Sequence, residues 1–477
     1  MMKHRNPLSL LCGLAAILSL PVAVSAANKE PEPPARPNIV LLMAEDMTLD
    51  LGCYGKPWLD TPHLDQLARE GTKYTRFYTT APMCSASRTS LMTGVYQTTS
   101  GGMHHRSRIK DPRPEGIRPL PHLLRDNGYV TVLGSEWIEP AGTKVDVNFT
   151  GWRGQYLFDY VADLATAREE HPGQPFFHQV QLALSHRWYS ERWPDMRESL
   201  PNPVDAEKIV LPPYLPDTPL VREDEALRLS AVQYIDQQAG KLLRKYEEAG
   251  LAENTVFIFI GDNGQNQVRG KSYLYEPGIL CPLLMKGPGP VPKQLVVDDL
   301  VTGVDLVATI LQLSGTPIPA WVQGRSFLAD PDYAPREAVV TARDRHDNVG
   351  DCIRAVTTRR YKYIRNFMPE VPWDAGMDYY EKNRPVLLQM RELHEKGGLT
   401  PAQARFLAPR KPEEELYDLR EDPHETVNLV EDPDYQRILK ELRASLHQWL
   451  EASNDRALRR TPEGEWQPLK EWRRIER

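Results

Sequence analysis

The chain has 477 residues, of which 41% are hydrophobic and 26% charged, and this composition is typical of a soluble globular protein. Its length exceeds the size at which a single hydrophobic core keeps growing, so we expect two domains. The net charge of −7 argues against nucleic acid or an acidic membrane surface as a partner.

The N-terminus has the pattern of a secretory signal peptide. Residues 3–5 are basic, residues 8–24 are largely apolar, and Val24-Ser25-Ala26 offers a small-residue cleavage site. A membrane anchor is the weaker alternative, because Pro21 interrupts the apolar run and no basic cluster follows it. No later segment is long and apolar enough to span a bilayer. We predict a signal peptide over 1–26, a periplasmic or secreted protein, and a Pro-rich linker over 27–37.

From residue 38 onward, strand signals alternate with helix signals, which predicts an α/β fold with a mostly parallel sheet covered by helices on both faces. The expected strands lie at 38–43, 129–134, 176–184, 255–260 and 281–285. The expected helices start at 61–64 and lie at 87–92, 223–249 and 304–313. Near residue 330 the pattern changes to strands at 337–342, 352–358 and 361–366, a polar insertion and an amphipathic helix at 433–452. We predict a catalytic domain over 38–330 and a smaller C-terminal α+β domain with a short sheet over 331–477.

Two polar pairs, Glu45-Asp46 and Asp262-Asn263, stand where predicted strands end. Open α/β sheets bind ligands outside the carboxyl ends of their strands, so the two pairs could converge. Three carboxylates and an amide oxygen would form an oxygen-only shell, which suits Ca²⁺ or Mg²⁺ better than zinc. The alternative for either pair is a turn former or a helix cap.

The segment Cys84-Ser85-Ala86-Ser87-Arg88, closed by Leu91-Met92-Thr93-Gly94, resembles the maturation signature of type I sulfatases. In that family the cysteine is oxidised to formylglycine, and its hydrated aldehyde is the nucleophile. The resemblance covers about the whole mature chain, through segments at 38–46, 61–65 and 176–177. Within the family the chain is most similar to N-sulfoglucosamine sulfohydrolases (sulfamidases) and their bacterial relatives, on segments at 215–219, 415–418 and 422–426. The resemblance implies the alkaline-phosphatase/sulfatase fold.

The same resemblance implies a role for each candidate residue. The metal ligands would be Glu45, Asp46, Asp262, Asn263 and Cys84 in its formylglycine form, with Ca²⁺ as the ion and Mg²⁺ as the alternative. Arg88, one helical turn after Cys84, would hold the nucleophile and the carboxylates in register. Lys271 would stabilise negative charge on a sulfate oxygen, and His186 would contact sulfate or protonate the leaving group. The sugar would be held by Arg345, His346 and Asp347. The alternatives are a solvated loop lysine for Lys271 and a core histidine for His186.

Three positions depart from the family pattern. Glu45 replaces the usual aspartate, and Ala86 replaces the usual proline, as in variants matured by a radical enzyme. The expected Gly-Lys-x-His is absent, because the chain reads Gly134-Ser135-Glu136-Trp137. Lys144 could restore the catalytic lysine after a short insertion, with Asp146 at the place of the histidine. A solvated loop lysine is the alternative.

Elementary chemistry favours modification of Cys84. Nearby carboxylates would raise the pKa of an unmodified thiol. A hydrated aldehyde on a divalent cation offers a hydroxyl that the metal activates as it activates bound water. The second hydroxyl can then expel sulfate and restore the aldehyde. Cys53, Cys281 and Cys352 would remain in the mature chain, and we expect at most one disulfide.

We therefore predict a sulfuric ester or sulfamate hydrolase that acts on a sulfated sugar, with N- or O-sulfated glucosamine of heparan-type glycans as the substrate class. Its second partner would be a sulfatase-maturing enzyme. One alternative is a broad arylsulfatase or a phosphohydrolase of the alkaline phosphatase superfamily, since phosphate and sulfate are nearly isosteric. Another is a catalytically inactive protein that binds sulfated glycans and keeps Cys84 as a thiol.

Overall fold

The computed structural model describes residues 36–106, 115–149, 152, 154–328 and 334–469. The predicted signal peptide, most of the predicted linker and the predicted domain boundary after residue 330 lie outside these residues. The division into domains at 38–330 and 331–477 therefore stays a prediction.

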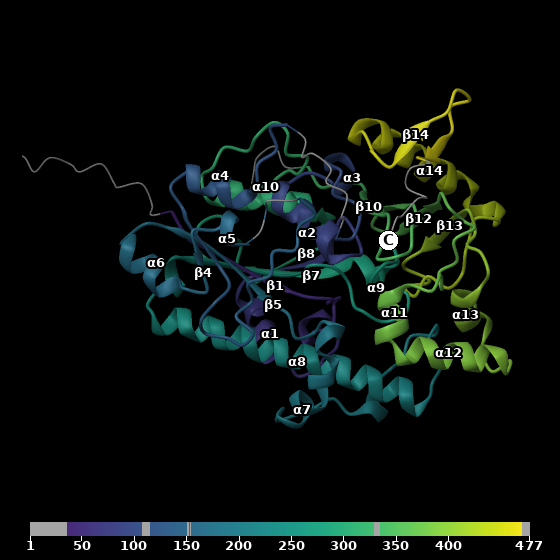
Figure 1. Cartoon of the computed structure of the whole chain (residues 1–477), viewed down its shortest axis with the longest axis horizontal. Coiled ribbons are helices and arrows are strands. Elements are labelled where there is room, and N and C mark those ends of the chain that lie inside the picture. The colour runs from purple at the N-terminus through teal and green to yellow at the C-terminus, as the bar shows by residue number, and fades with distance from the viewer. Residues whose placement is uncertain (1–35, 107–114, 150–151, 153, 329–333, 470–477) are drawn as a thin grey trace, which may run out of the picture. The chain divides into compact units, whose positions relative to one another are not determined.

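A large mixed sheet forms the centre of the N-terminal part of the fold (Figure 1). Its strand order is β4-β3-β5-β1-β6-β7-β2-β8, with β9 paired to β2. The strands are β1 (Asn38–Ala44), β2 (Thr72–Tyr78), β3 (Val130–Leu133), β4 (Tyr160–Val161), β5 (Phe176–Leu182), β6 (Thr255–Gly261), β7 (Leu280–Lys286), β8 (Leu295–Val297) and β9 (Val301–Thr302). Only β7 among these runs antiparallel to its neighbours, β6 and β2. The predicted mostly parallel sheet is confirmed.

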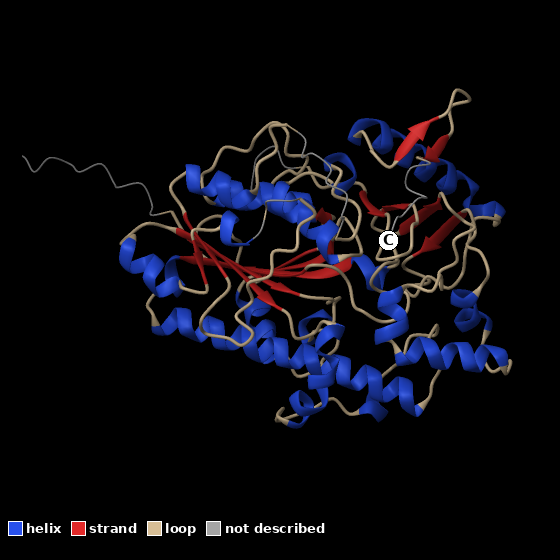
Figure 2. Cartoon of the chain, in the orientation of Figure 1, coloured by secondary structure: helices blue, strands red, loops and turns tan. Residues whose placement is uncertain are grey.

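Helices cover both faces of this sheet, as Figure 2 shows. One face carries α2 (Cys84–Thr93), α4 (Leu120–Asp126), α5 (Gly154–Leu157) and α10 (Gly303–Leu313), and the other carries α1 (Pro62–Glu70), α6 (Leu164–Glu170), α7 (Trp193–Glu198) and α8 (Pro219–Glu248). Strand β1 is fully buried between the two layers. Its residues Ile39, Leu41 and Met43 pack into one core, and Val40, Leu42 and Ala44 pack into the other, as the period of two in a strand requires.

The largest differences from the predicted elements have local causes. Helix α8 begins at Pro219, ahead of the predicted start at 223, because the Thr218 side chain accepts the Val221 N–H and proline suits the first helical position. Helix α2 begins at Cys84 itself, where a helix was expected only over 87–92. The sequence analysis also missed β2, which starts directly after Gly71 at the end of α1.

A second, antiparallel sheet follows in the C-terminal part of the chain, with the order β10-β11-β12-β13. Its strands are β10 (Val339–Arg343), β11 (Ile353–Thr357), β12 (Tyr361–Asn366) and β13 (Glu414–Asp418). Helix α14 (Gln436–Ser453) packs Leu439, Leu442, Leu446 and Leu450 against it. These features confirm the predicted short C-terminal sheet and terminal helix, and they show that the sheet is antiparallel.

The remaining short elements are α3 (Gln97–Ser100), α9 (Glu276–Ile279), α11 (Asp378–Asn383), α12 (Pro385–Glu395), α13 (Pro401–Ala404), β14 (Leu458–Arg460) and β15 (Trp466–Pro468). Helices α11 to α13 occupy the polar insertion, for which the sequence predicted no structure. None of the described helices combines the length and the apolar character that a bilayer crossing requires.

Candidate active site

The two acidic pairs meet at the carboxyl ends of β1 and β6. The parallel register pairs Ala44 with Gly261, so the residues that follow them emerge side by side. The Asp46 N–H donates to Asp262 Oδ1 at 3.1 Å, and Asn263 Nδ2 donates to Asp46 Oδ1 at 3.0 Å. Glu45, Asp46, Asp262 and Asn263 are all buried. The structure thus brings the four predicted oxygen ligands to one place.

Helix α2 presents the maturation motif to this cluster. Cys84 is its first residue and Arg88 lies one turn further on. Arg88 donates from Nε to Asp262 Oδ2 at 2.9 Å, and its Nη2 lies 3.3 Å from Glu45 Oε1. A third bond runs from Arg88 Nη1 to the Lys144 carbonyl at 3.2 Å. A buried arginine with these bonds holds the helix, the carboxylates and the Lys144 loop in fixed relation.

Two lysines complete the charge balance. Lys271, in the loop after β6, places Nζ 2.6 Å from Asp46 Oδ1, and Lys144 places Nζ 2.9 Å from Glu45 Oε1. Lys271 is 1% exposed, whereas Lys144 is 27% exposed. Asp146, which the sequence analysis set at the place of the family histidine, is ion-paired with Arg106, and its Oδ2 lies 3.5 Å from Lys144 Nζ. With Arg88, the three cations match the three buried carboxylates.

All four cysteines of the described chain are free thiols. Cys281 and Cys352 are buried, and Cys53 is of intermediate exposure. Cys84 is also buried. The expected rise in its pKa is wrong, because the net shift is downward. Burial and the Asp146 carboxylate raise the pKa of the Cys84 thiol, but the Lys271 and Lys144 charges and the hydrogen bond with His105 together bring it below its ordinary value. Lysines from two separate loops converge on the thiol, and this convergence could not be read from the sequence around Cys84.

His186 follows β5 and faces Lys271. Its Nδ1 accepts the Trp188 N–H at 3.0 Å, so the neutral ring carries its proton on Nε2. Burial and the Lys271 charge lower the pKa of His186 to about 4, which keeps the ring neutral. The Lys271 ammonium lies 3.2 Å from Nε2. Two N–H donors therefore lie side by side, and an oxyanion that bridged them would accept from both.

His105 contacts Cys84, although the sequence analysis did not select it. Its Nε2 lies 3.6 Å from Cys84 Sγ, and its Nδ1 lies 3.1 Å from Asp347 Oδ1. Arg345, predicted to bind sugar, donates from Nη2 to the His105 carbonyl at 2.7 Å. The signal in the sequence was the His104-His105 pair after the cysteine motif, in a chain that lacks the histidine of Gly-Lys-x-His.

His346 lies in the same neighbourhood, with its ring centroid 4.3 Å from that of His105. Its Nδ1 is hydrogen-bonded to Ser272 Oγ, and its buried Nε2 has no hydrogen-bond partner within the described part of the chain. The nitrogen and oxygen atoms of His105, His346 and Asp347 that could bind a metal lie within 4.8 Å of one another. Imidazole ligands suit zinc better than calcium, so this group differs in kind from the carboxylate cluster.

The carboxylate cluster has the properties of a hard-cation site. Asn263 Oδ1 is buried and has no hydrogen-bond partner among the described residues. Burial raises the pKa of Asp262, and the Glu45 and Asp46 charges add to this against the lowering by Arg88. A divalent cation would supply a partner for the amide oxygen and would relieve the repulsion among the carboxylates. The residues present therefore fit the predicted Ca²⁺ or Mg²⁺.

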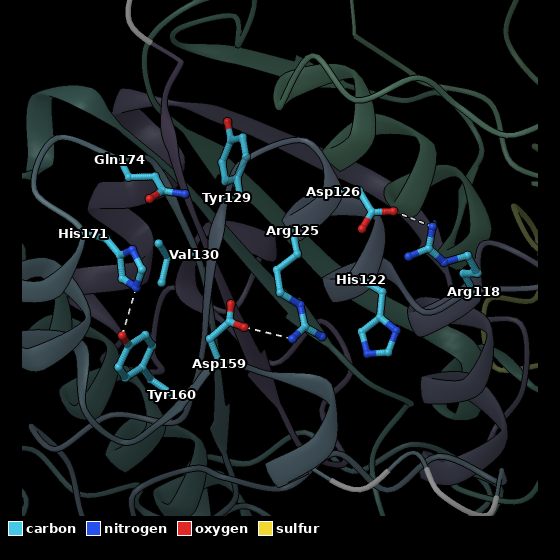
Figure 3. A pocket seen from close by; sticks show the side chains of 10 residues that line it. All are labelled: Arg118, His122, Arg125, Asp126, Tyr129, Val130, Asp159, Tyr160, His171 and Gln174. Carbon is cyan, nitrogen blue, oxygen red and sulfur yellow. Dashed lines mark hydrogen bonds and ion pairs between the residues drawn. The ribbon is translucent and has the colours of Figure 1, made fainter.

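The site opens into a cavity of about 430 Å³, lined by Glu45, Lys144, His186, Arg106, Trp188, Tyr189 and neighbouring residues. Figure 3 shows a different cavity, at the amino end of β3. There Arg118 pairs with Asp126 and Arg125 pairs with Asp159, so both arginines already have carboxylate partners. Of these two cavities, the one beside Glu45 reaches the carboxylate cluster and the Lys144 ammonium.

Comparisons with known proteins agree with this site. The family model for sulfatases matches residues 37–316, and the model for the N-sulphoglucosamine sulphohydrolase C-terminal region matches residues 264–383. An ulvan-active sulfatase of Formosa agariphila is 32% identical over 89% of this chain and 76% of its own length. Human N-sulphoglucosamine sulphohydrolase is 29% identical over 88% of this chain and 91% of its own.

A solved structure shares the fold at 17% identity, with a TM-score of 0.63 over 88% of this chain and 98% of the other. That protein was solved with its substrate D-glucosamine-2-N,6-O-disulfate. The family match covers more than half of the sequence, and it agrees with a cysteine motif placed against buried carboxylates and cations. The chain belongs to the sulfatase family and is a sulfuric ester hydrolase.

Proposed function

We propose that this sulfatase removes sulfate from N- or O-sulfated glucosamine of heparan-type glycans, with residue 84 as formylglycine. The observation that carries the proposal is the position of Cys84 at the start of α2, a helix that Arg88 holds against the buried carboxylates of Asp262 and Glu45. The sugar class is supported by the match to the N-sulphoglucosamine sulphohydrolase C-terminal model and by the human relative of that name.

The nucleophile requires maturation of Cys84. A separate maturing enzyme would oxidise the thiol to an aldehyde, and addition of water would give the two hydroxyls at residue 84. The apolar run with its small-residue cleavage site in residues 1–26 supports export as part of the proposal, to the periplasm or out of the cell.

The metal proposed for the carboxylate cluster is Ca²⁺, with Mg²⁺ as the alternative. Its ligands would be Glu45, Asp46, Asp262, Asn263 and residue 84. Bound there, the ion would lower the pKa of a hydroxyl at residue 84 and stabilise charge on sulfate.

The chain's own residues would bind and orient the sulfate. Lys271 Nζ and His186 Nε2, which lie 3.2 Å apart, would donate to sulfate oxygens. These donors are fixed by Asp46 and by the Trp188 N–H, so little reorganisation would be needed as negative charge develops. Lys144, anchored on Glu45, would face the same anion from the open side of the cavity.

The histidines would support the proton transfers. His186 is neutral in the free protein, so its Nε2–H would donate a hydrogen bond to the leaving nitrogen or oxygen of the sugar, and the proton for the leaving group would come from water. His105 Nε2, oriented through Nδ1 by Asp347, would take the proton of the hydroxyl at residue 84 when the aldehyde is restored. His105 would thus replace the histidine that the chain lacks in Gly-Lys-x-His.

The proposed function is tested by sulfate release from a panel of sugars. Matured protein is incubated with N-sulfoglucosamine, O-sulfated glucosamines and nitrophenyl sulfate, and free sulfate is measured by ion chromatography. We expect turnover of at least one glucosamine sulfate with a kcat/KM above that for nitrophenyl sulfate. Turnover of nitrophenyl sulfate alone would contradict the sugar class and favour a broad arylsulfatase.

Metal binding gives a test that does not depend on turnover. In the unmodified protein, Ca²⁺ at a hundredfold excess over its Kd should stabilise the fold by about 2.7 kcal/mol and raise Tm. Asn263→Ala should remove most of this rise, because Asn263 supplies the buried amide oxygen. Asn202→Ala, which removes an exposed amide elsewhere, is the control and should keep it.

The same thermal unfolding assay with Mg²⁺ and Zn²⁺ identifies the ion. Stabilisation by Zn²⁺ that depends on His346 and not on Asn263 would contradict the assignment of the carboxylate cluster as the metal site.

A further inference from the structure

Arg384, between α11 and α12, is a buried arginine whose guanidinium has no hydrogen-bond partner among the residues that the structure describes. Its side chain is among the largest in the protein that are less than 2% exposed. Nε, Nη1 and Nη2 all lack a hydrogen-bond partner within the described residues. The sequence analysis left this insertion without a function.

The guanidinium stacks on two aromatic rings. Its Cζ lies 3.7 Å from the centroid of the Tyr380 ring and 5.5 Å from that of Tyr379. Stacking on aromatic rings offsets part of the cost of removing a cation from water. It leaves the N–H donors of the guanidinium unsatisfied, and burying an unpaired charge is among the most unfavourable arrangements in a protein. The arrangement is therefore that of a site that awaits an anionic partner.

Tyr379 and Tyr380 join Arg384 to the active site. The Tyr379 hydroxyl lies 3.4 Å from Asp46 Oδ2, and its ring is 5.1 Å from Lys271 Nζ. The same ring lies 5.8 Å from the His186 ring and 5.8 Å from the His346 ring. The Tyr380 hydroxyl donates to the Lys271 carbonyl. Arg384 is thus separated from the sulfate-binding residues by a single aromatic side chain.

A second unsatisfied group lies on the same aromatic wall. His346 Nε2 is fully buried and lacks a hydrogen-bond partner within the described chain. Tyr379 touches both residues, since its ring packs against the His346 ring and under the Arg384 guanidinium. Two buried groups that need partners flank one tyrosine at the edge of the catalytic cluster.

We infer that Arg384 binds a second oxyanion of the substrate, distinct from the sulfate that is cleaved. A planar guanidinium pairs with a carboxylate or a sulfate through two parallel hydrogen bonds. The oxyanion would be either a second sulfate on the same glucosamine or the carboxylate of a neighbouring uronic acid. This inference rests on the proposed function. Arg384 would be the residue that sets the preference of the enzyme among sulfated sugars.

The inference is tested by binding, in protein that cannot cleave its substrate. Dissociation constants are measured by calorimetry on Cys84→Ala protein, with and without Arg384→Met, in the presence of Ca²⁺. The probes are N-sulfoglucosamine, glucosamine N,6-O-disulfate and a disaccharide of uronic acid with N-sulfoglucosamine. Arg391→Met, which removes a cation from α12 that already pairs with Asp374 and Glu381, is the matched control.

We expect Arg384→Met to weaken binding of the disulfate, the disaccharide or both by about 10- to 100-fold, as loss of a charged hydrogen-bonded pair requires. Binding of N-sulfoglucosamine should change by less than about twofold, and the control should leave all three constants unchanged. The probe that loses affinity identifies the oxyanion as sulfate or carboxylate. An equal loss on all three probes, or no loss on any, would overturn the inference.

Thermal unfolding separates a binding role from a structural one. If Arg384 has no partner in the free protein, Arg384→Met should leave Tm unchanged or raise it. A large fall in Tm, repeated with Arg384→Lys, would show that the side chain is part of the folded framework and would overturn the inference. Sulfate release by matured wild-type protein tests the proposed function separately, so the two can fail independently.

Discussion

Replacing Cys84 by alanine is expected to reduce sulfate release from glucosamine sulfates by about 10⁴-fold or more. The reason is that alanine cannot be oxidised to an aldehyde, so the site would have no nucleophile, and loss of a nucleophile removes most of an enzyme's rate enhancement. The measurement is kcat/KM for variant and wild-type protein produced together with the same maturing enzyme.

The control for the Cys84→Ala variant is a check that it still folds and still binds Ca²⁺. Among the described residues, Cys84 Sγ makes one contact near hydrogen-bond distance, with His105, so its removal should leave the secondary structure and the Ca²⁺-dependent rise in Tm in place. A Cys84→Ala protein that is folded, binds Ca²⁺ and still releases sulfate at a wild-type rate would contradict the assigned nucleophile.

Replacing His105 by asparagine is expected to lower kcat by about 10²- to 10⁴-fold, which is the usual contribution of a positioned acid or base. The physical reason is the position of Nε2, 3.6 Å from Cys84 Sγ, where it can receive a proton from a hydroxyl at residue 84. KM should change little, because Lys271 and His186 would still bind the sulfate.

A double-mutant cycle with Asp347→Asn tests whether the two residues act together. If Asp347 works by orienting His105, the double variant should lose no more activity than His105→Asn alone. Additive losses would show that Asp347 acts separately, as in the sugar-binding role that the sequence predicted for it. Retained kcat in His105→Asn would remove His105 from the mechanism.

Much of the sheet and of the carboxylate cluster could be predicted from the sequence because both follow local rules. The apolar runs at β1 and β6 are long enough to show buried strands, and the acidic pairs follow each run directly. In a parallel sheet these strand ends meet at one edge, so Glu45 and Asp262 came together once the two strands paired. The rule needs no knowledge of the loops.

The sequence analysis did not find His105, and it did not foresee the surroundings of Lys144. Both residues lie on loops whose paths depend on tertiary packing. His105 follows a short helix and reaches Cys84 with Asp347, which is far away in the chain, as its support. Lys144 reaches Glu45 across an extended loop, and its charge, with that of Lys271, reverses the expected shift of the Cys84 pKa. Because that pKa is lowered, the case for formylglycine depends on the maturation motif and the family match.

Arg384 shows a further limit of sequence reasoning. An arginine in a polar insertion is ordinarily a solvated side chain. The inference that it binds an anion depends on its burial on Tyr380, with no hydrogen-bond partner for its donors in the described part of the chain. The helices of this insertion are short and carry mixed polar sequence, so neither their existence nor their approach to Asp46 through Tyr379 could be predicted from periodicity.

The central claim, that residue 84 is a formylglycine, is tested most directly by mass spectrometry of the peptide that spans it. The protein should be exported from a host that carries a radical-type sulfatase-maturing enzyme, with a known sulfatase in the same host as a control. We predict the mass of formylglycine at residue 84 and the reaction of its aldehyde with a hydrazide. An intact Cys84 thiol in protein from a host whose control sulfatase is fully converted would contradict the account.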